Sequence, residues 1–161
     1  MKRILTATAI AATLAAGNAQ AAQATQPFNV VITLASTCTL SAVADLTFAY
    51  TSMQAGSVNA LGGGFSVTCT TSLPYSFALV QGTPAGPFTP PFATSIPSVT
   101  DNAVQLNYSL GLSATTGIGN GAAQNYGVTG LMAGGQVGTC NSASCVNTGS
   151  TNKTHTLILN Y

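Results

Sequence analysis

Four cysteines are the residues of this chain whose type and spacing most clearly predict chemistry. Cys38 and Cys69 lie in different apolar stretches, whereas Cys140 and Cys145 flank the short polar sequence NSAS. An even number of cysteines in an exported protein predicts disulfides, although the sequence alone allows three pairings. We expect bonds between Cys38 and Cys69 and between Cys140 and Cys145. The alternative interpretation is that the cysteines bind zinc, but the chain has no C-x₂-C pair and its only histidine, His155, lies beside the C-terminus.

The acidic and basic side chains are too few and too scattered to indicate catalysis. Beyond residue 21 the chain carries only Asp45, Asp101, Lys153 and His155, with no glutamate or arginine. Catalysis usually needs a positioned acid, base or nucleophile. A Ser–His–Asp set could be composed because serines abound, but no G-x-S-x-G context surrounds any serine. We therefore expect no enzymatic activity and no cofactor, and we interpret His155 as a strand residue facing solvent or an interface.

The very low charge also bears on possible partners. No basic patch is present, so nucleic-acid binding lacks its main driving force. No cluster of carboxylates or histidines could hold a hard metal ion. A nearly neutral surface gives little repulsion between copies, which suits a protein that associates with itself.

The first 21 residues have the features of a secretion signal. Lys2 and Arg3 precede an apolar run over residues 4–16, and small residues follow in A-x-A-like order. We favour cleavage after Ala21, with Ala19 and Ala24 as alternatives. A membrane anchor is a weaker interpretation, because the apolar run is shorter than the ~20 residues that a spanning helix needs. The remaining residues, 22–161, amount to one domain with a sizeable core.

Strands joined by turns are the structure that this composition favours. Thr, Ser, Asn, Gly and Ala dominate, with scattered Val, Tyr and Phe and no helical periodicity after the signal. Prolines make residues 82–99 a long irregular loop rather than a strand pair. A second polar loop covers residues 133–152. Short strands with an inter-strand disulfide predict an antiparallel, immunoglobulin-like sandwich. The predicted strands are 26–34, 37–40, 45–50, 64–70, 74–81, 103–112, 124–132 and 153–161.

Residues 26–34 are the most informative of these stretches. Phe28, Val30, Ile32 and Leu34 alternate with other residues, so an extended chain places these four on one face. An apolar strand directly after a secretion signal either completes its own sheet or is available to complete that of a neighbour. In the second case the protein is the subunit of a polymer.

The chain resembles a known family, the spore coat protein U domain, which includes the subunits of archaic chaperone–usher pili. The most specific match is L-N-Y-S-L at residues 106–110 followed by G-N-G at 119–121. Other pieces agree in order: the N-terminal strand leading to Cys38, the L-x-F-x-Y at 46–50, F-S-V-T-C at 65–69, and the closing T-L-I-L-N-Y at 156–161. Ile118, Asn120 and Gly111 stand where the family usually has Trp, Asp and an aromatic residue, which leaves open a main or a minor subunit.

The resemblance implies assembly by donor-strand exchange. Such domains are immunoglobulin-like sandwiches that lack a final strand and are completed by donor-strand exchange, in which residues 22–35 of the next subunit fill the gap. It also implies a periplasmic chaperone that contacts Leu157, Leu159 and Tyr161, an outer-membrane usher, and a place on the cell surface with roles in adhesion or biofilm. Physically, this is β-strand addition to an exposed sheet edge.

Three other functions stay open at this point. The same domain name covers structural proteins of spore or cell coats. Alternating strands and a C-terminal Tyr161 are also found in small outer-membrane β-barrels, although a proline-rich segment and two disulfides fit these poorly. Tyrosines at 50, 75, 108 and 126 could form a sugar-stacking face, but tyrosines in strands are more often packing partners.

Overall fold

The structure is a computed structural model that describes residues 23–83, 93–147 and 153–161. The expected secretion signal, residues 1–21, and the prolines at 84, 87, 90 and 91 lie outside these ranges. The chain divides into two units, Met1–Thr33 and Leu34–Tyr161. In the described part of the chain no helix is long and apolar enough to cross a membrane.

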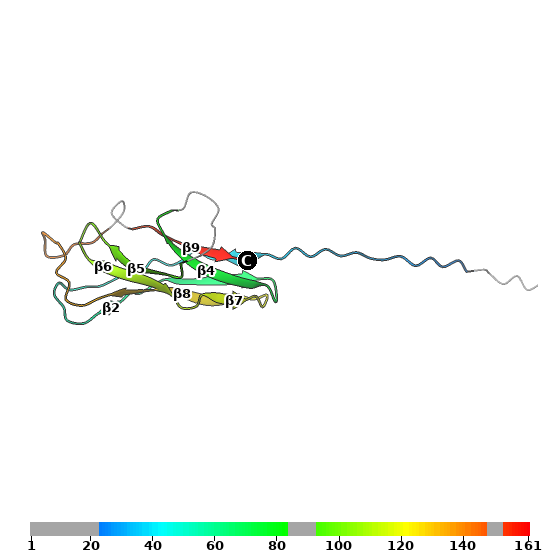
Figure 1. The fold of residues 1–161 in the computed structure, drawn as a ribbon, viewed down its shortest axis with the longest axis horizontal. Coiled ribbons are helices and arrows are strands. Elements are labelled where there is room, and N and C mark those ends of the chain that lie inside the picture. Colours follow the sequence, from blue (N-terminus) through cyan, green and yellow to red (C-terminus); the bar gives the residue numbers. More distant parts are fainter. Residues whose placement is uncertain (1–22, 84–92, 148–152) are drawn as a thin grey trace, which may run out of the picture. The chain divides into compact units, whose positions relative to one another are not determined.

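The larger unit is an all-β sandwich of two antiparallel sheets (Figure 1). The first sheet has the strand order β1-β3-β8-β6-β5, with β2 also pairing with β8. Its strands are β1 (Cys38–Leu40), β2 (Val58–Asn59), β3 (Gly64–Cys69), β5 (Ser95–Thr100), β6 (Asn107–Leu112) and β8 (Gln124–Met132). The second sheet has the order β7-β4-β9, from β4 (Pro74–Gln81), β7 (Thr116–Ile118) and β9 (His155–Asn160). The predicted immunoglobulin-like sandwich is confirmed.

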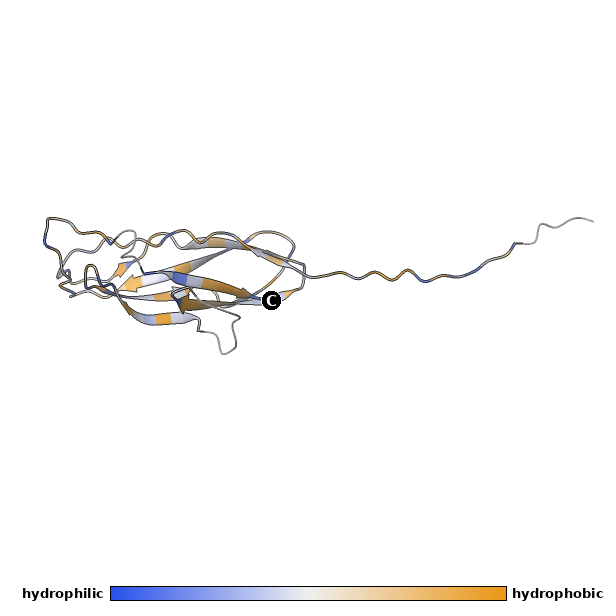
Figure 2. Ribbon diagram, turned by 90° about the horizontal axis from the view of Figure 1, so that it is seen from above, coloured by the Kyte–Doolittle hydropathy of each residue, from blue (hydrophilic) through white to orange (hydrophobic). Residues whose placement is uncertain are grey.

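Alternation along the strands builds the core between the two sheets. In β3, Phe65 and Val67 are buried, whereas the residues between them are more exposed. Phe77 of β4 packs edge-on against Phe65, with their ring centroids 5.3 Å apart. Figure 2 shows hydrophobic segments along the inner strands, separated by more polar turns. Phe77 therefore packs across the core between the two sheets.

Most of the predicted strands are present, with shifted ends. The intervals 74–81 and 124–132 are confirmed as β4 and β8, and the predictions at 37–40, 64–70 and 153–161 differ from the strands by one or two residues. The interval 103–112 begins late, at Asn107, because a turn occupies the positions before it. The interval 45–50 contains only an isolated bridge from Thr47 to Leu61. Residues 26–34 form no strand within the single chain.

The prediction that 82–99 is irregular throughout was wrong at its C-terminal end. Ser95–Thr100 forms β5, an outer strand that pairs with β6. Pro97 is tolerated there because an edge strand needs hydrogen bonds on one side only. The register shifts between Ile96 and Val99, so the strand bends around the proline.

Candidate functional site

The N-terminal segment presents a row of apolar side chains to solvent. Residues 23–37 have no strand assignment, and Ile32 is 85% exposed. The other predicted donor residues are exposed to a similar degree: Phe28, Val30 and Leu34. Figure 2 shows the alternation of hydrophobic and polar residues along this segment. Large apolar side chains in such a row usually mark an interaction surface.

Four strands form the outer edges of the two sheets, and they differ in what they offer an incoming strand. The edge strand β5 contains Pro97 and a register shift, which are common devices against edge pairing. The edge strands β1 and β7 have only three residues each. The edge strand β9 has six residues and no proline. β5 has the same length but is interrupted, so β9 is the longest uninterrupted edge among the described residues at which a strand could be added.

Only every second residue of β9 forms backbone hydrogen bonds with β4. The Gly82 N–H donates to Thr154 O at 2.7 Å, while the N–H groups of Phe77 and Leu79 donate to Thr115 and Ala93 instead. Bonds between β4 and β9 therefore involve every second pair. In an antiparallel ladder, this alternation turns the N–H and C=O groups of the intervening β9 residues toward the open edge: His155, Leu157 and Leu159.

The side chains of β9 continue the core up to this edge. Leu157 and Leu159 are half-buried and pack against the core cluster. They lie opposite the buried Leu79 and Phe77 of β4. Tyr161, beyond the strand, is 62% exposed. The three residues expected to contact a chaperone thus lie at one sheet edge or just after it, with apolar surface still accessible.

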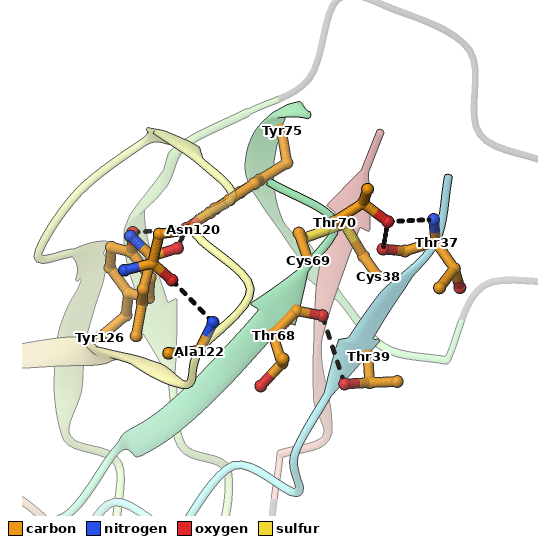
Figure 3. The surroundings of a disulfide bond; sticks show 11 residues. Thr37, Cys38, Thr39, Thr68, Cys69, Thr70, Tyr75, Asn120, Ala122 and Tyr126 are labelled. Carbon is orange, nitrogen blue, oxygen red and sulfur yellow. Dashed lines mark hydrogen bonds between the residues drawn. A yellow bond between two sulfur atoms is a disulfide. The ribbon is translucent and has the colours of Figure 1, made fainter. Parts of the chain in front are cut away.

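The strand β1 is held in place at the edge of the other sheet by a disulfide. Cys38 bonds to Cys69 of β3, and the pairing Cys140–Cys145 is also present, so both predicted disulfides are confirmed. Figure 3 shows the first bond with hydrogen bonds on either side: Thr37 N–H donates to Thr70 Oγ1, and Thr39 Oγ1 donates to Thr68 O. The disulfide therefore pins the point at which the N-terminal segment joins the sandwich.

His155, at the start of β9, faces the interior rather than solvent. Its Nε2 lies 2.8 Å from the hydroxyl of Tyr108 on β6, and its Nδ1 is buried with no hydrogen-bond partner in the described structure. Burial, and then the charge of Lys153, lower the pKa of His155 below its ordinary value of 6.5. The neutral imidazole is thus the form that the fold favours.

This burial predicts a loss of stability in mild acid. Because the pKa of His155 is lower in the folded state, the folded protein binds fewer protons than the unfolded chain. The contribution of the neutral ring is present above pH 6.5 and is lost as pH falls below that value. We expect the urea midpoint to fall between pH 7 and pH 5 in the parent. His155→Gln, which removes the only histidine, should be nearly flat over that range; an equal fall in both would contradict the assignment.

Asp101, a candidate acid in the sequence, has a structural role. Its side chain is 1% exposed, and its Oδ1 accepts hydrogen bonds from the N–H groups of Ala103 and Val104. Its Oδ2 accepts a hydrogen bond of 2.5 Å from Nδ2 of Asn147. Asp101 thus closes the β5–β6 turn and ties it to the segment after Cys145. Nothing in the sequence around Asn147 indicated this contact.

The hydrogen bonds of the described residues bring no catalytic set together. His155 contacts Tyr108, and the partners of Asp101 are backbone groups and an amide. The tyrosines do not form one stacking face either. The hydroxyls of Tyr75 and Tyr126 lie 2.6 Å apart inside the sandwich, and Tyr50 accepts a hydrogen bond from Gln136 N–H. Burial and the hydrogen bond to Tyr126 raise the pKa of Tyr75 to about 12, so its hydroxyl stays neutral.

The fold and its open edge define a β-sandwich that carries an apolar, unpaired N-terminal segment. Comparison with protein families places the chain more closely: residues 24–157 match the Spore Coat Protein U domain, and the chain belongs to this family. The family consists of structural subunits of pilus or coat type and is not enzymatic. Searches of curated proteins and of solved structures found no match.

Proposed function

We propose that this protein is the subunit of a secreted surface fibre and polymerises by donating residues 22–35 to the open sheet edge of the next copy. The observation that carries the proposal is the exposed apolar row of Phe28, Val30, Ile32 and Leu34. Burying four such side chains at about 1.5–3 kcal/mol each gives roughly 6–12 kcal/mol per junction before the costs of association.

The proposal includes the route by which the subunit reaches the surface. Residues 1–21 direct export to the periplasm, where a chaperone strand covers the β9 edge through Leu157, Leu159 and Tyr161. An outer-membrane usher then exchanges that strand for the N-terminal segment of the next subunit. The fibre serves adhesion or biofilm formation. A coat protein is the second candidate, favoured by the family match, and it would use the same junction without a chaperone or usher.

Limited proteolysis of monomer and polymer tests the proposal. The segment lacks lysine and arginine, so a chymotrypsin-like protease that cuts after Phe28 and Leu34 is suitable. We expect rapid cleavage after Phe28 in the monomer, because an exposed segment without strand pairing opens readily. In the polymer, cleavage of the same bond should be at least about tenfold slower. A tenfold ratio corresponds to ~1.4 kcal/mol of protection. Equal protection in both forms would mean that the segment belongs to its own sheet.

A further inference from the structure

We propose that the Cys140–Cys145 disulfide is a site of thiol–disulfide exchange, and that its reduction by a dithiol releases a contact with the buried carboxylate of Asp101. Such a redox-sensitive site goes beyond the proposed function, because polymerisation by a donated strand does not require it. Three features support it: the exposure of the disulfide, a hydroxyl beside its second sulfur, and the contacts of its loop with the β5–β6 turn.

The two disulfides differ in how far solvent reaches them. Cys69 is buried in the core cluster, and Cys38 packs against that cluster. Cys140 is exposed and Cys145 is half-buried, and both lie outside the strands, in the loop after β8. Exposed disulfides are generally the labile ones, whereas structural disulfides resist reduction. A dithiol should therefore reduce Cys140–Cys145 before Cys38–Cys69.

The loop favours attack on one of its two sulfurs. Cys140 is the more accessible residue, so the incoming thiolate reaches its Sγ first and Cys145 Sγ leaves as a thiolate. Ser142 Oγ lies 3.5 Å from Cys145 Sγ, and its hydroxyl donates to Ser144 O at 2.7 Å while the disulfide is closed. A turn of this hydroxyl directs its proton to the leaving thiolate. A hydrogen bond stabilises a thiolate, and a more stable thiolate leaves faster.

The exchange moves two electrons from the dithiol to the protein. The first thiolate of the dithiol forms a mixed disulfide with Cys140 while the Cys140–Cys145 bond breaks. The second thiolate of the same molecule then attacks the mixed disulfide and releases Cys140. The dithiol ends as a cyclic disulfide, and its two thiol protons end on Cys140 and Cys145. The protein disulfide is thus the oxidant, and the dithiol is the reductant.

The disulfide loop holds the β5–β6 turn at two points, one on each side of the bond. Directly before Cys140, the N–H of Thr139 donates to Val104 O at 2.7 Å. Shortly after Cys145, Nδ2 of Asn147 donates to Oδ2 of Asp101 at 2.5 Å. The bond holds the two cysteine Cα atoms 5.7 Å apart, whereas the same five-residue step can extend to about 17 Å once the bond is broken. The disulfide therefore fixes the spacing of the two contacts.

The buried carboxylate of Asp101 depends on this spacing. Its Oδ2 accepts the hydrogen bond from Asn147, and its Oδ1 accepts those from the N–H groups of Ala103 and Val104. When the loop is free to extend, Asn147 can leave, and a buried carboxylate oxygen without a donor is costly. The turn then opens more often, and its amides exchange faster with solvent. The redox state of the disulfide thus sets the local stability of the β5–β6 turn.

Reduction of the purified, folded subunit by dithiothreitol tests the proposal. Free thiols are alkylated at intervals and located by mass spectrometry, and the exchange of the Ala103 and Val104 amides is followed by NMR. We expect alkylation of Cys140 and Cys145 while Cys38–Cys69 stays closed. The two amides should exchange at least about tenfold faster after reduction, because the carboxylate that holds them has lost a partner. Asn147→Ala should give the same fast exchange without any reductant.

Ser142→Ala tests the role of the hydroxyl, with Ser144→Ala as its matched control, since the control keeps the backbone carbonyl that Ser142 contacts. We expect reduction to be at least about threefold slower in Ser142→Ala and unchanged in Ser144→Ala. Equal rates in the two variants would overturn the role of Ser142. Reduction of Cys38–Cys69 first, or reduction of Cys140–Cys145 with no change in the exchange of the turn amides, would overturn the proposed site.

Discussion

Replacing Ile32 by aspartate should prevent polymerisation while leaving the subunit folded. Ile32 is 85% exposed in the single chain, so the substitution disturbs no packing there. At the proposed junction the same side chain would have to enter an apolar site, where an unpaired carboxylate costs several kcal/mol. Because each ~1.4 kcal/mol changes an equilibrium constant tenfold, we expect assembly to weaken by a factor of about 100 or more. Purified subunits are polymerised and examined for ladders that resist detergent at room temperature.

Thr33→Asp is the matched control for this experiment. It places the same charge one residue further along, on the opposite face of the strand, where the side chain need not enter the core. Its effect should therefore be clearly milder. If Ile32→Asp assembles as well as the parent, or if both variants fail to fold, the donor-strand interpretation is wrong. Circular dichroism of each monomer separates a folding defect from an assembly defect.

The sequence predicted the sandwich well where local pattern and packing agree. The interval 124–132 alternates over nine residues and is confirmed as β8 without any shift. The pattern failed in β5, because Pro97 normally argues against a strand and only its position at a sheet edge makes it acceptable. At residues 45–50 the pattern predicted a strand that the structure does not contain. These alternating residues lack a long strand to pair with, and Thr47 forms only an isolated bridge.

The donor segment of the candidate site could be predicted from the sequence, whereas the acceptor edge at β9 could not. The apolar row of residues 26–34 is a local pattern and can be read directly from the sequence. The contact between His155 and Tyr108, and that between Asp101 and Asn147, join residues more than 40 positions apart. Such contacts depend on the order of strands in the sheets, which spacing along the chain does not reveal.

Gly119 of the family motif and Gly117 of β7 illustrate how such distant packing constrains a sequence. A side chain at Gly119 would collide with the backbone of Cys69 and Thr70, next to the disulfide. A side chain at Gly117 would overlap the ring of Tyr75, with a Cβ only 2.5 Å from its hydroxyl oxygen. These positions need glycine because β7 lies directly against Tyr75 of β4, and the loop after β7 lies directly against the end of β3. The motif thus supports the core at the same end of the sandwich as the disulfide.

Removing the Cys38–Cys69 disulfide should have the largest effect on the stability of the monomer. The bond closes a loop of 32 residues, counted from Cys38 to Cys69, for which the chain-entropy model gives about 3.7 kcal/mol. The bond also fastens β1, which has only three residues and pairs with β3 alone. We expect the double variant Cys38→Ala/Cys69→Ala to lose roughly 2–5 kcal/mol of unfolding free energy, measured by urea denaturation.

The second disulfide provides the control for this loss. Cys140–Cys145 closes only six residues within a loop, so Cys140→Ala/Cys145→Ala should lose no more than about 2 kcal/mol. Equal losses would show that loop length and the anchoring of β1 do not determine the effect. The first variant should also assemble poorly even under conditions where it remains folded, because β1 is the strand that directly follows the donor segment. When β1 is no longer fastened to β3, the donor segment that precedes β1 loses its fixed attachment to the sandwich of its own subunit.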